Sequence, residues 1–148
     1  MNDEYDSEKY LPPLFGVPIS IKDNIEMQGT RSTMGLTKRA LKKHEADSIF
    51  PICAKNSGMI PFVKSNVPQM CMTYDSTNFL WGHCLNPWNL KKSAGGSSGG
   101  EGALVAAKLS PIGIGNDLLG SVRIPAAFNG VVGLMSSAGR LPLFNTAT

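Results

Sequence analysis

The chain has 148 residues, of which 42% are hydrophobic and 17% are charged, and its net charge is +3. This composition is ordinary for one globular domain that can bury a core, and so small a net charge does not indicate a nucleic-acid partner. The longest unbroken apolar stretches are only a few residues. A membrane-spanning helix requires roughly 20 such residues, so the sequence predicts no bilayer span.

The beginning of the chain and its cysteines indicate where the protein works. Residues 1–12 are acidic and polar and lack the basic start and apolar stretch of a secretory signal, so we expect a flexible lead-in. The three cysteines are an odd number without CxxC spacing, which favours reduced thiols in an intracellular compartment, whether cytoplasmic or membrane-associated. A metal site of Cys71, His83 and Cys84 would need a second paired motif. We therefore predict neither a metal nor a cofactor.

The expected regular elements alternate between strands and helices. Residues 15–22 alternate in polarity, which predicts a strand whose last residue, Lys22, points away from the apolar face. The further elements expected are a helix capped by Asp47 or Ser48 and ended by Gly58, a strand at 59–64, a helix at 101–108, and strands at 111–117 and 131–135. This order indicates an α/β fold, with a mostly parallel or mixed sheet flanked by helices.

The irregular stretch 78–102 is rich in Gly, Ser, Asn and Pro and is longer than loops usually run unless they have a function. Its segment GGSSGGEG could cradle a phosphate, but Glu101 stands where the GxxxxGK motif requires a lysine. A GxSxG nucleophile elbow around Ser97 would need a histidine further along the chain, whereas both histidines come earlier. Nucleotide binding and an α/β-hydrolase elbow are therefore the less favoured interpretations.

A serine nucleophile without a usable histidine requires another base, and a lysine made neutral by desolvation can take that place. Lys22 ends an apolar strand, so burial against a core would lower its pKa. From the strand alone, a solvent-exposed lysine is the more common outcome. The strand pattern therefore leaves the role of Lys22 open.

Three blocks of sequence, in order, resemble those of the amidase signature family. PLFGVPISIKDN contains Lys22, GGSSGG contains Ser97 and Ser98, and DLLGSVRIPAAFNG contains Ser121. Within the family, KSNVPQ at 64–69 and NPW resemble the fatty acid amide hydrolase branch. The resemblance covers nearly the whole chain and implies an amidase-signature α/β core. It further implies that residues 13–148 are the N-terminal part of a catalytic domain and that the fold is incomplete in this chain.

The resemblance also implies hydrolysis of carboxylic amides, fatty acid amides among them, through a Ser-Ser-Lys triad and an acyl-enzyme. In that scheme Ser121 is the nucleophile, Ser97 is the bridging serine, usually preceded by a cis peptide bond, and Lys22 is the base. The expected partner is a small-molecule amide, with no nucleic acid and no cofactor, and a homodimer is left open.

The same resemblance assigns supporting roles around the nucleophile. Asp117 and Arg123 look like scaffolding for the loop, and Ser98 like support for the triad. The backbone N–H groups expected to bind the oxyanion are those of Leu118, Leu119, Gly120 and Ser121.

Departures from the family pattern support two alternatives. Leu119 replaces a glycine, Asn116 stands where threonine or serine is common, and GLMSSAGRL at 133–141 replaces GLKPTxGR. A side chain at a glycine position predicts backbone strain at Leu119 and weaker catalysis. A catalytically impaired fragment or pseudoenzyme is therefore one alternative, and an amidase component of an amidotransferase is the second.

Overall fold

The computed structural model describes residues 11–141, so nearly all of the expected lead-in lies outside the described residues. Two short 3-10 turns, at Thr37–Arg39 and Gln69–Cys71, accompany the regular elements. Those elements are β1 (Pro18–Lys22), α1 (Ile49–Asn56), β2 (Ile60–Ser65), β3 (Thr77–Asn78), β4 (Gly82–His83), β5 (Leu85–Asn86), β6 (Asn89–Ser93), α2 (Gly99–Ala106), β7 (Ile112–Ile114) and α3 (Arg123–Asn129).

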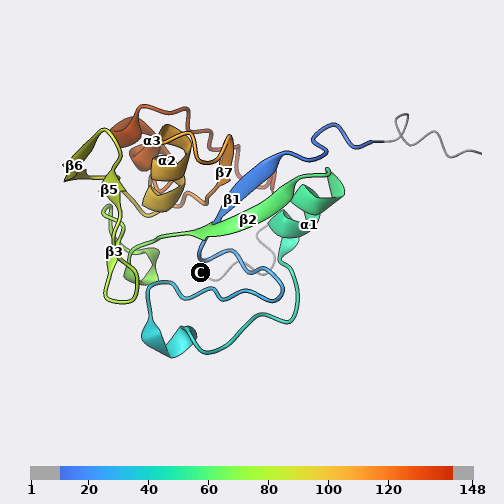
Figure 1. The fold of residues 1–148 in the computed structure, drawn as a ribbon, viewed down its shortest axis with the longest axis horizontal. Helices are drawn as coiled ribbons and strands as arrows, with labels where there is room; N and C mark the ends of the chain where they lie inside the picture. Colours follow the sequence, from blue (N-terminus) through green and yellow to red (C-terminus); the bar gives the residue numbers. More distant parts are fainter. Residues whose placement is uncertain (1–10, 142–148) are drawn as a thin grey trace, which may run out of the picture.

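The main sheet has three strands in the order β2-β1-β7, with β1 in the centre and parallel to both neighbours. Figure 1 shows β1 and β2 running side by side through the middle of the molecule, with β7 next to β1. In this register Lys22 is opposite Ser65. The predicted α/β fold with a parallel sheet is confirmed.

The two faces of β1 carry different chemistry. Ile19 and Ile21 are fully buried and form the apolar core with Ile25 and Ala54, the latter from α1. Ser20 and the other side chains of alternating parity lie on the opposite face, which α2 covers. Lys22 belongs to this second face, as the alternation predicts, and is also fully buried.

Helix α1 begins after Ser48, as predicted, but the Ser48 side chain makes no capping bond to the helix. Its hydroxyl instead donates to the Glu26 carbonyl oxygen at 2.8 Å. The helix ends just before Gly58, which has a φ of +82° and approaches the backbone of Phe15 so closely that a Cβ would collide with it. Gly58 therefore lets the chain turn tightly from α1 into β2.

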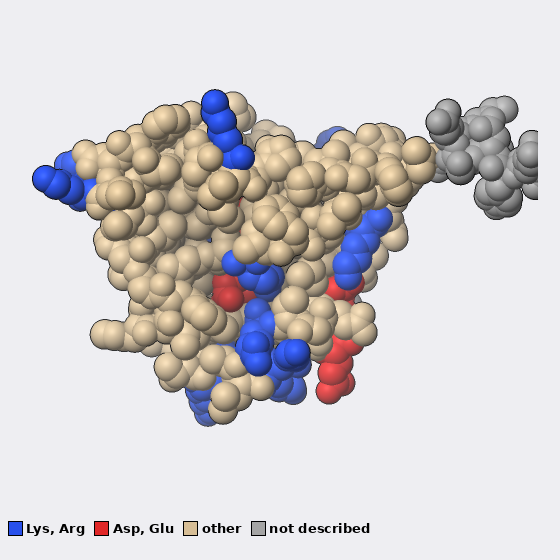
Figure 2. All heavy atoms as spheres, viewed as in Figure 1, with Lys and Arg blue, Asp and Glu red and all other residues tan. Residues whose placement is uncertain are grey.

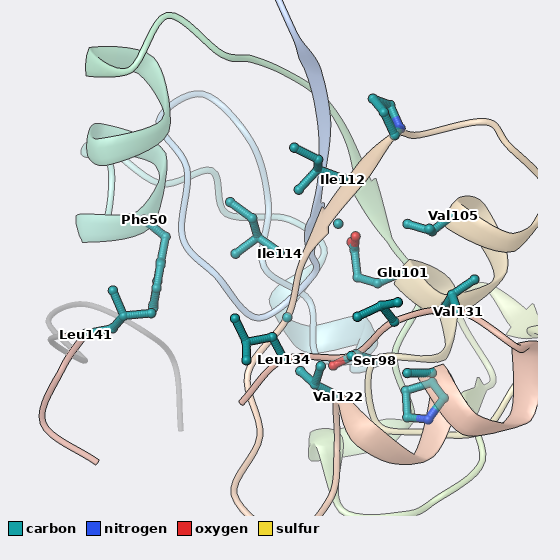
Figure 3. Close-up of a pocket in the computed structure, with 18 residues that line it drawn as sticks. Phe50, Ser98, Glu101, Val105, Ile112, Ile114, Val122, Val131, Leu134 and Leu141 are labelled. Carbon is teal, nitrogen blue, oxygen red and sulfur yellow. The ribbon is translucent and has the colours of Figure 1, made fainter. Parts of the chain in front are cut away.

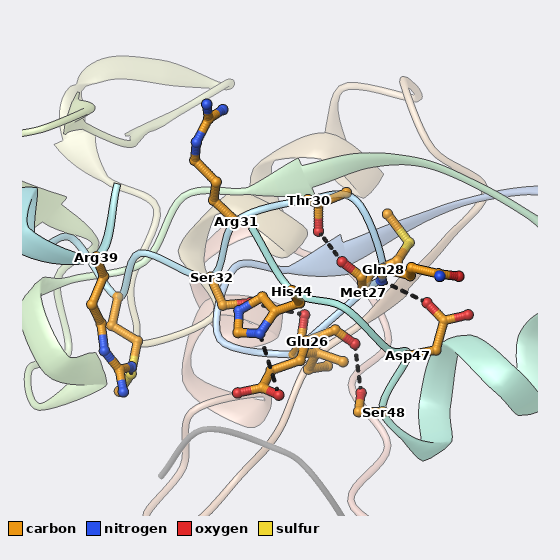
Figure 4. A network of polar contacts seen from close by, with 12 residues as sticks. Glu26, Met27, Gln28, Thr30, Arg31, Ser32, Arg39, His44, Asp47 and Ser48 are labelled. Carbon is orange, nitrogen blue, oxygen red and sulfur yellow. Dashed lines mark hydrogen bonds and ion pairs between the residues drawn. The ribbon is translucent and has the colours of Figure 1, made fainter. Parts of the chain in front are cut away.

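Polar contacts hold the connection between β1 and α1 in place (Figure 4). The backbone N–H of Gln28 donates to Asp47 Oδ1 at 2.8 Å, and Gln28 forms an isolated β-bridge with His44. His44 Nδ1 lies 3.4 Å from Glu26 Oε2. These contacts tie the two ends of the connection to one another.

The segment between β2 and α2 is mostly irregular, as expected, but it contains two short hairpins, β3–β4 and β5–β6. The strand predicted at 131–135 is wrong, because those residues form no regular element. They run along α3, where Gly133 is so close to Ala126 that a Cβ would collide, and no strand of the described residues pairs with them. Helix α3 itself was not predicted.

The surface shown in Figure 2 carries scattered Lys and Arg side chains, a few of them around an acidic group in a central hollow, and broad areas with neither charge. Within residues 11–141, no helix is both long and apolar enough to cross a bilayer. Several large apolar side chains are more than four-fifths exposed, namely Leu41, Phe79, Leu118, Val132 and Leu134.

These exposed side chains lead to a prediction for the 148-residue chain expressed alone. Apolar surface of this kind is expected to bind a hydrophobic dye and to promote self-association. Dye fluorescence and size-exclusion chromatography measure the two effects. A dye-silent monomer with one cooperative thermal transition would contradict the prediction.

Candidate active site

The carboxyl end of β1 delivers the Lys22 amine to the glycine-rich loop before α2. Lys22 Nζ lies 2.8 Å from Ser97 Oγ and 2.6 Å from Asn116 Oδ1. The Asn116 carbonyl oxygen is 3.4 Å from the same nitrogen. Three segments separated by as many as 94 positions therefore meet at one fully buried amine.

Ser97 connects this amine to a second serine. Its hydroxyl oxygen is 2.8 Å from Ser121 Oγ, so Lys22, Ser97 and Ser121 form a continuous hydrogen-bonded chain, the relay. The peptide bond between Gly96 and Ser97 is cis, as the resemblance implies. Each hydroxyl can both donate and accept a hydrogen bond, which allows a proton to pass along the relay in either direction.

Glycines around Ser97 allow the loop to lie against neighbouring backbone. A Cβ at Gly96 would approach the Asp75 nitrogen to 2.9 Å, and one at Gly100 would meet the Asn66 backbone. Gly100 is also bonded there, since its N–H donates to the Asn66 carbonyl at 3.1 Å. The glycines of this segment therefore fix the position of Ser97 through close backbone contacts rather than by making the loop flexible.

Burial is the main cause that lowers the pKa of Lys22 from 10.5 to about 8, and the negative charges of Glu101 and Asp117 partly oppose it. A neutral lysine amine has two N–H donors and one lone pair. The two oxygens of Asn116 accept from the amine, which leaves its lone pair free to face Ser97. The geometry and the lowered pKa both suit a general base near neutral pH.

Lys64 is a second buried lysine, and burial likewise lowers its pKa to about 8. Its amine donates to the carbonyl oxygens of Asp23 at 2.8 Å and Ile25 at 2.5 Å and to Ser32 Oγ at 3.1 Å. These three acceptors match the three N–H donors of an ammonium group. The one hydroxyl among them, that of Ser32, is bonded onward to the Ile25 carbonyl oxygen and not to a second serine. Lys64 therefore holds the segment after β1 in place and does not belong to the relay.

The loop that carries Ser121 is held by the Asp117 carboxylate. Oδ1 accepts from the Gly120 N–H at 2.7 Å, and Oδ2 accepts from the N–H groups of Val122 at 3.1 Å and Arg123 at 3.2 Å. The Arg123 guanidinium also donates to both carboxylate oxygens at 3.0 Å. The Arg123 side chain, followed by the backbone N–H groups, holds the pKa of Asp117 well below its usual range.

The loop 118–121, expected to bind the oxyanion, differs from the sequence expectation in two respects. Of the four N–H groups expected to bind the oxyanion, that of Gly120 is already bonded to Asp117. The other three, those of Leu118, Leu119 and Ser121, have no partner among the described residues. The strain predicted at Leu119 is wrong, because the left-handed conformation falls on Gly120, with a φ of +106°, and not on Leu119. A leucine therefore fits this backbone without a conformational penalty.

Ser98 supports the site from behind. It is buried, its N–H donates to the Ser121 carbonyl at 3.0 Å, and its hydroxyl is 3.5 Å from the Asn116 carbonyl. Behind these residues lies a cavity of about 490 Å³ whose lining is mostly apolar and includes Ser98 and Glu101 (Figure 3). These contacts make Ser98 a support for the Ser121 backbone.

Metal-ligating side chains do not gather in this structure. Among residues 11–141 no group of three or more His, Cys, Asp and Glu side chains is arranged to hold a metal ion. His83 Nε2 instead lies 2.8 Å from Asp75 Oδ1, and Cys71 and Cys84 are free thiols.

Sequence reasoning missed two parts of the site. Asn116 was noted only as a departure from a pattern, whereas it contributes two acceptors to the Lys22 amine. Glu101 was used only to dismiss a phosphate loop, whereas it is a buried carboxyl bonded by Ser20. Small and apolar residues follow Glu101 in the predicted helix, which is typical of a buried helix. A carboxylate on such a helix is the available sign that it needs a partner.

Comparison with known proteins identifies the family of this chain. Residues 1–147 match the family described as Amidase. Fatty-acid amide hydrolase 1 of Sus scrofa is 45% identical over 128 residues, covering 86% of this chain and 22% of that protein. An acetamidase of Aspergillus oryzae is 44% identical over 135 residues, covering 91% of this chain and 25% of that protein. The chain thus spans about a quarter of the length of these relatives.

Comparison with solved structures shows that the fold is also that of an amidase-family protein. One component of the glutamyl-tRNA(Gln) amidotransferase of Thermotoga maritima superposes with a TM-score of 0.87 at 32% identity, covering 90% of this chain and 29% of that chain. Because the family match covers nearly the whole chain and the described core has the same fold, this chain belongs to the amidase signature family, with a fatty acid amide hydrolase among its similar relatives.

Proposed function

We propose that this chain carries the catalytic residues of an amide hydrolase that works through a serine acyl-enzyme. The observation that carries the proposal is the relay, in which Lys22 Nζ, Ser97 Oγ and Ser121 Oγ are joined by two contacts of 2.8 Å. A buried lysine with a lowered pKa, next to two serines in series, supplies a base and a nucleophile. Lys22, Ser97 and Ser121 are the proposed catalytic residues.

In the first half of the reaction, Ser121 Oγ attacks the amide carbonyl carbon while its proton passes to Ser97, and the Ser97 proton passes to Lys22. The carbonyl oxygen takes the negative charge, and the N–H groups of Leu118, Leu119 and Ser121 are the proposed donors to it. The C–N bond then breaks, and the amine leaves with a proton returned through Ser97. Water hydrolyses the resulting ester at Ser121, which releases the acid and restores the relay.

The proposed substrates are carboxylic amides with an apolar acyl group, fatty acid amides among them. The similarity to a fatty acid amide hydrolase supports this choice, as do the exposed side chains of Leu118 and Leu119 next to the nucleophile. The similarity to an acetamidase favours smaller amides as the second candidate. Rates on primary amides of increasing acyl length distinguish the two.

Labelling with a fluorophosphonate tests the nucleophile in the complete protein that contains these residues. We expect the probe to modify the peptide that holds Ser121, because its oxygen is the terminal hydroxyl of the relay. Peptide mass spectrometry locates the label. The variant Ser121→Ala should take up none, whereas a control variant of an exposed serine, Ser137→Ala, should label as the native protein does. A label that lands on Ser97, or that persists in Ser121→Ala, would overturn the assignment.

A further inference from the structure

A carboxyl group that the proposed chemistry does not use lies on the relay side of the sheet. Glu101 is in the first turn of α2, and its side chain points from α2 toward β7 (Figure 3). It is only 6% exposed, and a side chain at Gly113 would collide with its Oε2. Strand β7 therefore has a glycine at the point where it passes this carboxyl group.

The hydrogen bonds of Glu101 are incomplete for so buried a group. Ser20 Oγ donates to Oε2, and the Ser65 hydroxyl is near enough to favour the carboxylate, but the buried Oε1 makes no hydrogen bond of normal geometry with a described residue. Burial raises the pKa of Glu101 to about 7, against the opposing effects of Ser20, Ser65, Lys22 and Lys64. If this acid only fastened α2 to the sheet, an apolar side chain of similar size would give a protein of equal or greater stability.

The placement of Ser20 connects Glu101 to the proposed base. Ser20 and Lys22 are two positions apart on β1, so both side chains lie on the face that α2 covers, and both are fully buried. The Lys22 amine is hydrogen-bonded to Asn116 and Ser97 and not to Glu101. Ser20 thus holds the carboxyl group near the amine without letting the two form a direct ion pair.

We propose that Glu101 is a positioning residue that sets the basicity of Lys22 through its negative charge, with Ser20 holding its carboxylate in place. This inference rests on the function proposed above. When Lys22 takes the proton from Ser97 it becomes an ammonium ion in a buried site, and a nearby fixed negative charge stabilises that ion. Glu101 therefore makes Lys22 a stronger base.

Few other charged groups surround Glu101 and Lys22. Strand β1 contributes Lys22 on the same face as Glu101, and strand β2 contributes Lys64, which is paired with Ile21 and acts on Glu101 from the opposite face. Strand β7 has no titratable residue, and Arg123 of α3 is paired with Asp117. Besides Glu101, Asp117 carries a negative charge that acts on Lys22. Cys71 would add one only as a thiolate, a form that burial disfavours by raising the pKa of its thiol.

The variant Glu101→Gln keeps the size of the side chain and removes its charge. On the acidic side of the pH profile, kcat/KM should rise as Lys22 loses its proton, and we call this rise the acidic limb. Loss of the nearby negative charge lowers the pKa of Lys22, so the limb should move to lower pH by about half a unit to one unit. The plateau at high pH should fall by about two- to threefold, because the base is weaker. A uniform loss of activity at every pH, with the limb unmoved, would show a purely structural role.

Two further variants sharpen the test. Ser20→Ala removes the bond that stabilises the carboxylate, so it should move the limb in the same direction, and it should add nothing in the Glu101→Gln background. Asp47→Asn also removes one negative charge, but from an acid paired with Lys55 of α1, the helix that packs on the opposite face of the sheet, and it should leave the limb in place. Additive shifts of Ser20→Ala and Glu101→Gln would contradict the proposed role of Ser20.

A stability measurement separates this proposal from the failure of the proposed function. Because the folded-state pKa of Glu101 is raised from 4.5 to about 7, the stability of the native protein relative to Glu101→Gln should fall as the pH rises from about 4.5 to 7 and then stay constant. Thermal unfolding across this range needs no substrate. If this slope appears but no amide is cleaved and Ser121 takes no label, the function fails while the buried acid remains. If the slope and the shifted limb are both missing, the Glu101 proposal fails alone.

Discussion

Replacement of Lys22 by methionine is expected to lower kcat/KM for amide hydrolysis by about a thousandfold, within the range that general base catalysis commonly contributes. The apolar side chain fills the buried site but cannot accept the proton of Ser97. Native activity should rise with pH as Lys22, with a pKa of about 8, loses its proton, and this limb should be missing from the variant. Rates on a good amide substrate between pH 6 and 10 measure both effects.

The matched control is the second buried lysine. Lys64→Met also removes an amine whose pKa is lowered to about 8, but one that donates to carbonyl oxygens. We expect this variant to lose thermal stability and to keep the acidic limb of whatever activity remains. A loss of less than about tenfold in Lys22→Met, or an unchanged limb, would show that Lys22 is not the base.

Replacement of Asp117 by alanine is expected to lower kcat by about a hundredfold or more. The carboxylate accepts from three backbone N–H groups on the loop that carries Ser121, and their loss lets the proposed oxyanion donors move. Losing one such donor typically costs about 100- to 1000-fold in rate. Labelling of Ser121 should become slower but should stay on the same residue.

Arg123 provides the comparison for this experiment, because Arg123→Ala removes the guanidinium and leaves all three backbone bonds to Asp117. Its side chain is 55% exposed, so the loss in kcat should remain below about tenfold. Equal losses in Asp117→Ala and Arg123→Ala would mean that the ion pair, and not the backbone contacts, holds the loop.

The sequence predicted the elements that have clear periodicity and the residues that stand in family motifs. Strand β1 was foreseen from its alternating side chains, and its face assignment placed Lys22 opposite the apolar core. Helix α3 was missed because its seven residues contain a proline and show no apolar stripe. The strand expected at 131–135 failed because a run of apolar residues needs a pairing partner as well as β propensity.

The contacts within the site were beyond sequence reasoning for a different reason. Motifs identified Lys22, Ser97 and Ser121, but no local pattern gives the meeting of Asn116 with a lysine 94 positions away. The strain expected at Leu119 was misjudged because a glycine in a motif does not reveal which φ it adopts. In this loop the left-handed position is one residue further along, at Gly120.

The central position of β1 makes the length of this strand more important than its exact composition. Its residues are paired on both sides, to β2 and to β7, while its side chains alternate between the apolar core and the relay. Exchanging one core isoleucine for valine leaves the amine where it is. Deleting a single residue within β1 would turn every later side chain to the opposite face, so that Lys22 would turn toward the apolar core and Asp23 would take its place beside Ser97. In evolution, this strand can therefore exchange its apolar residues freely but cannot gain or lose one without disconnecting the base from the serines.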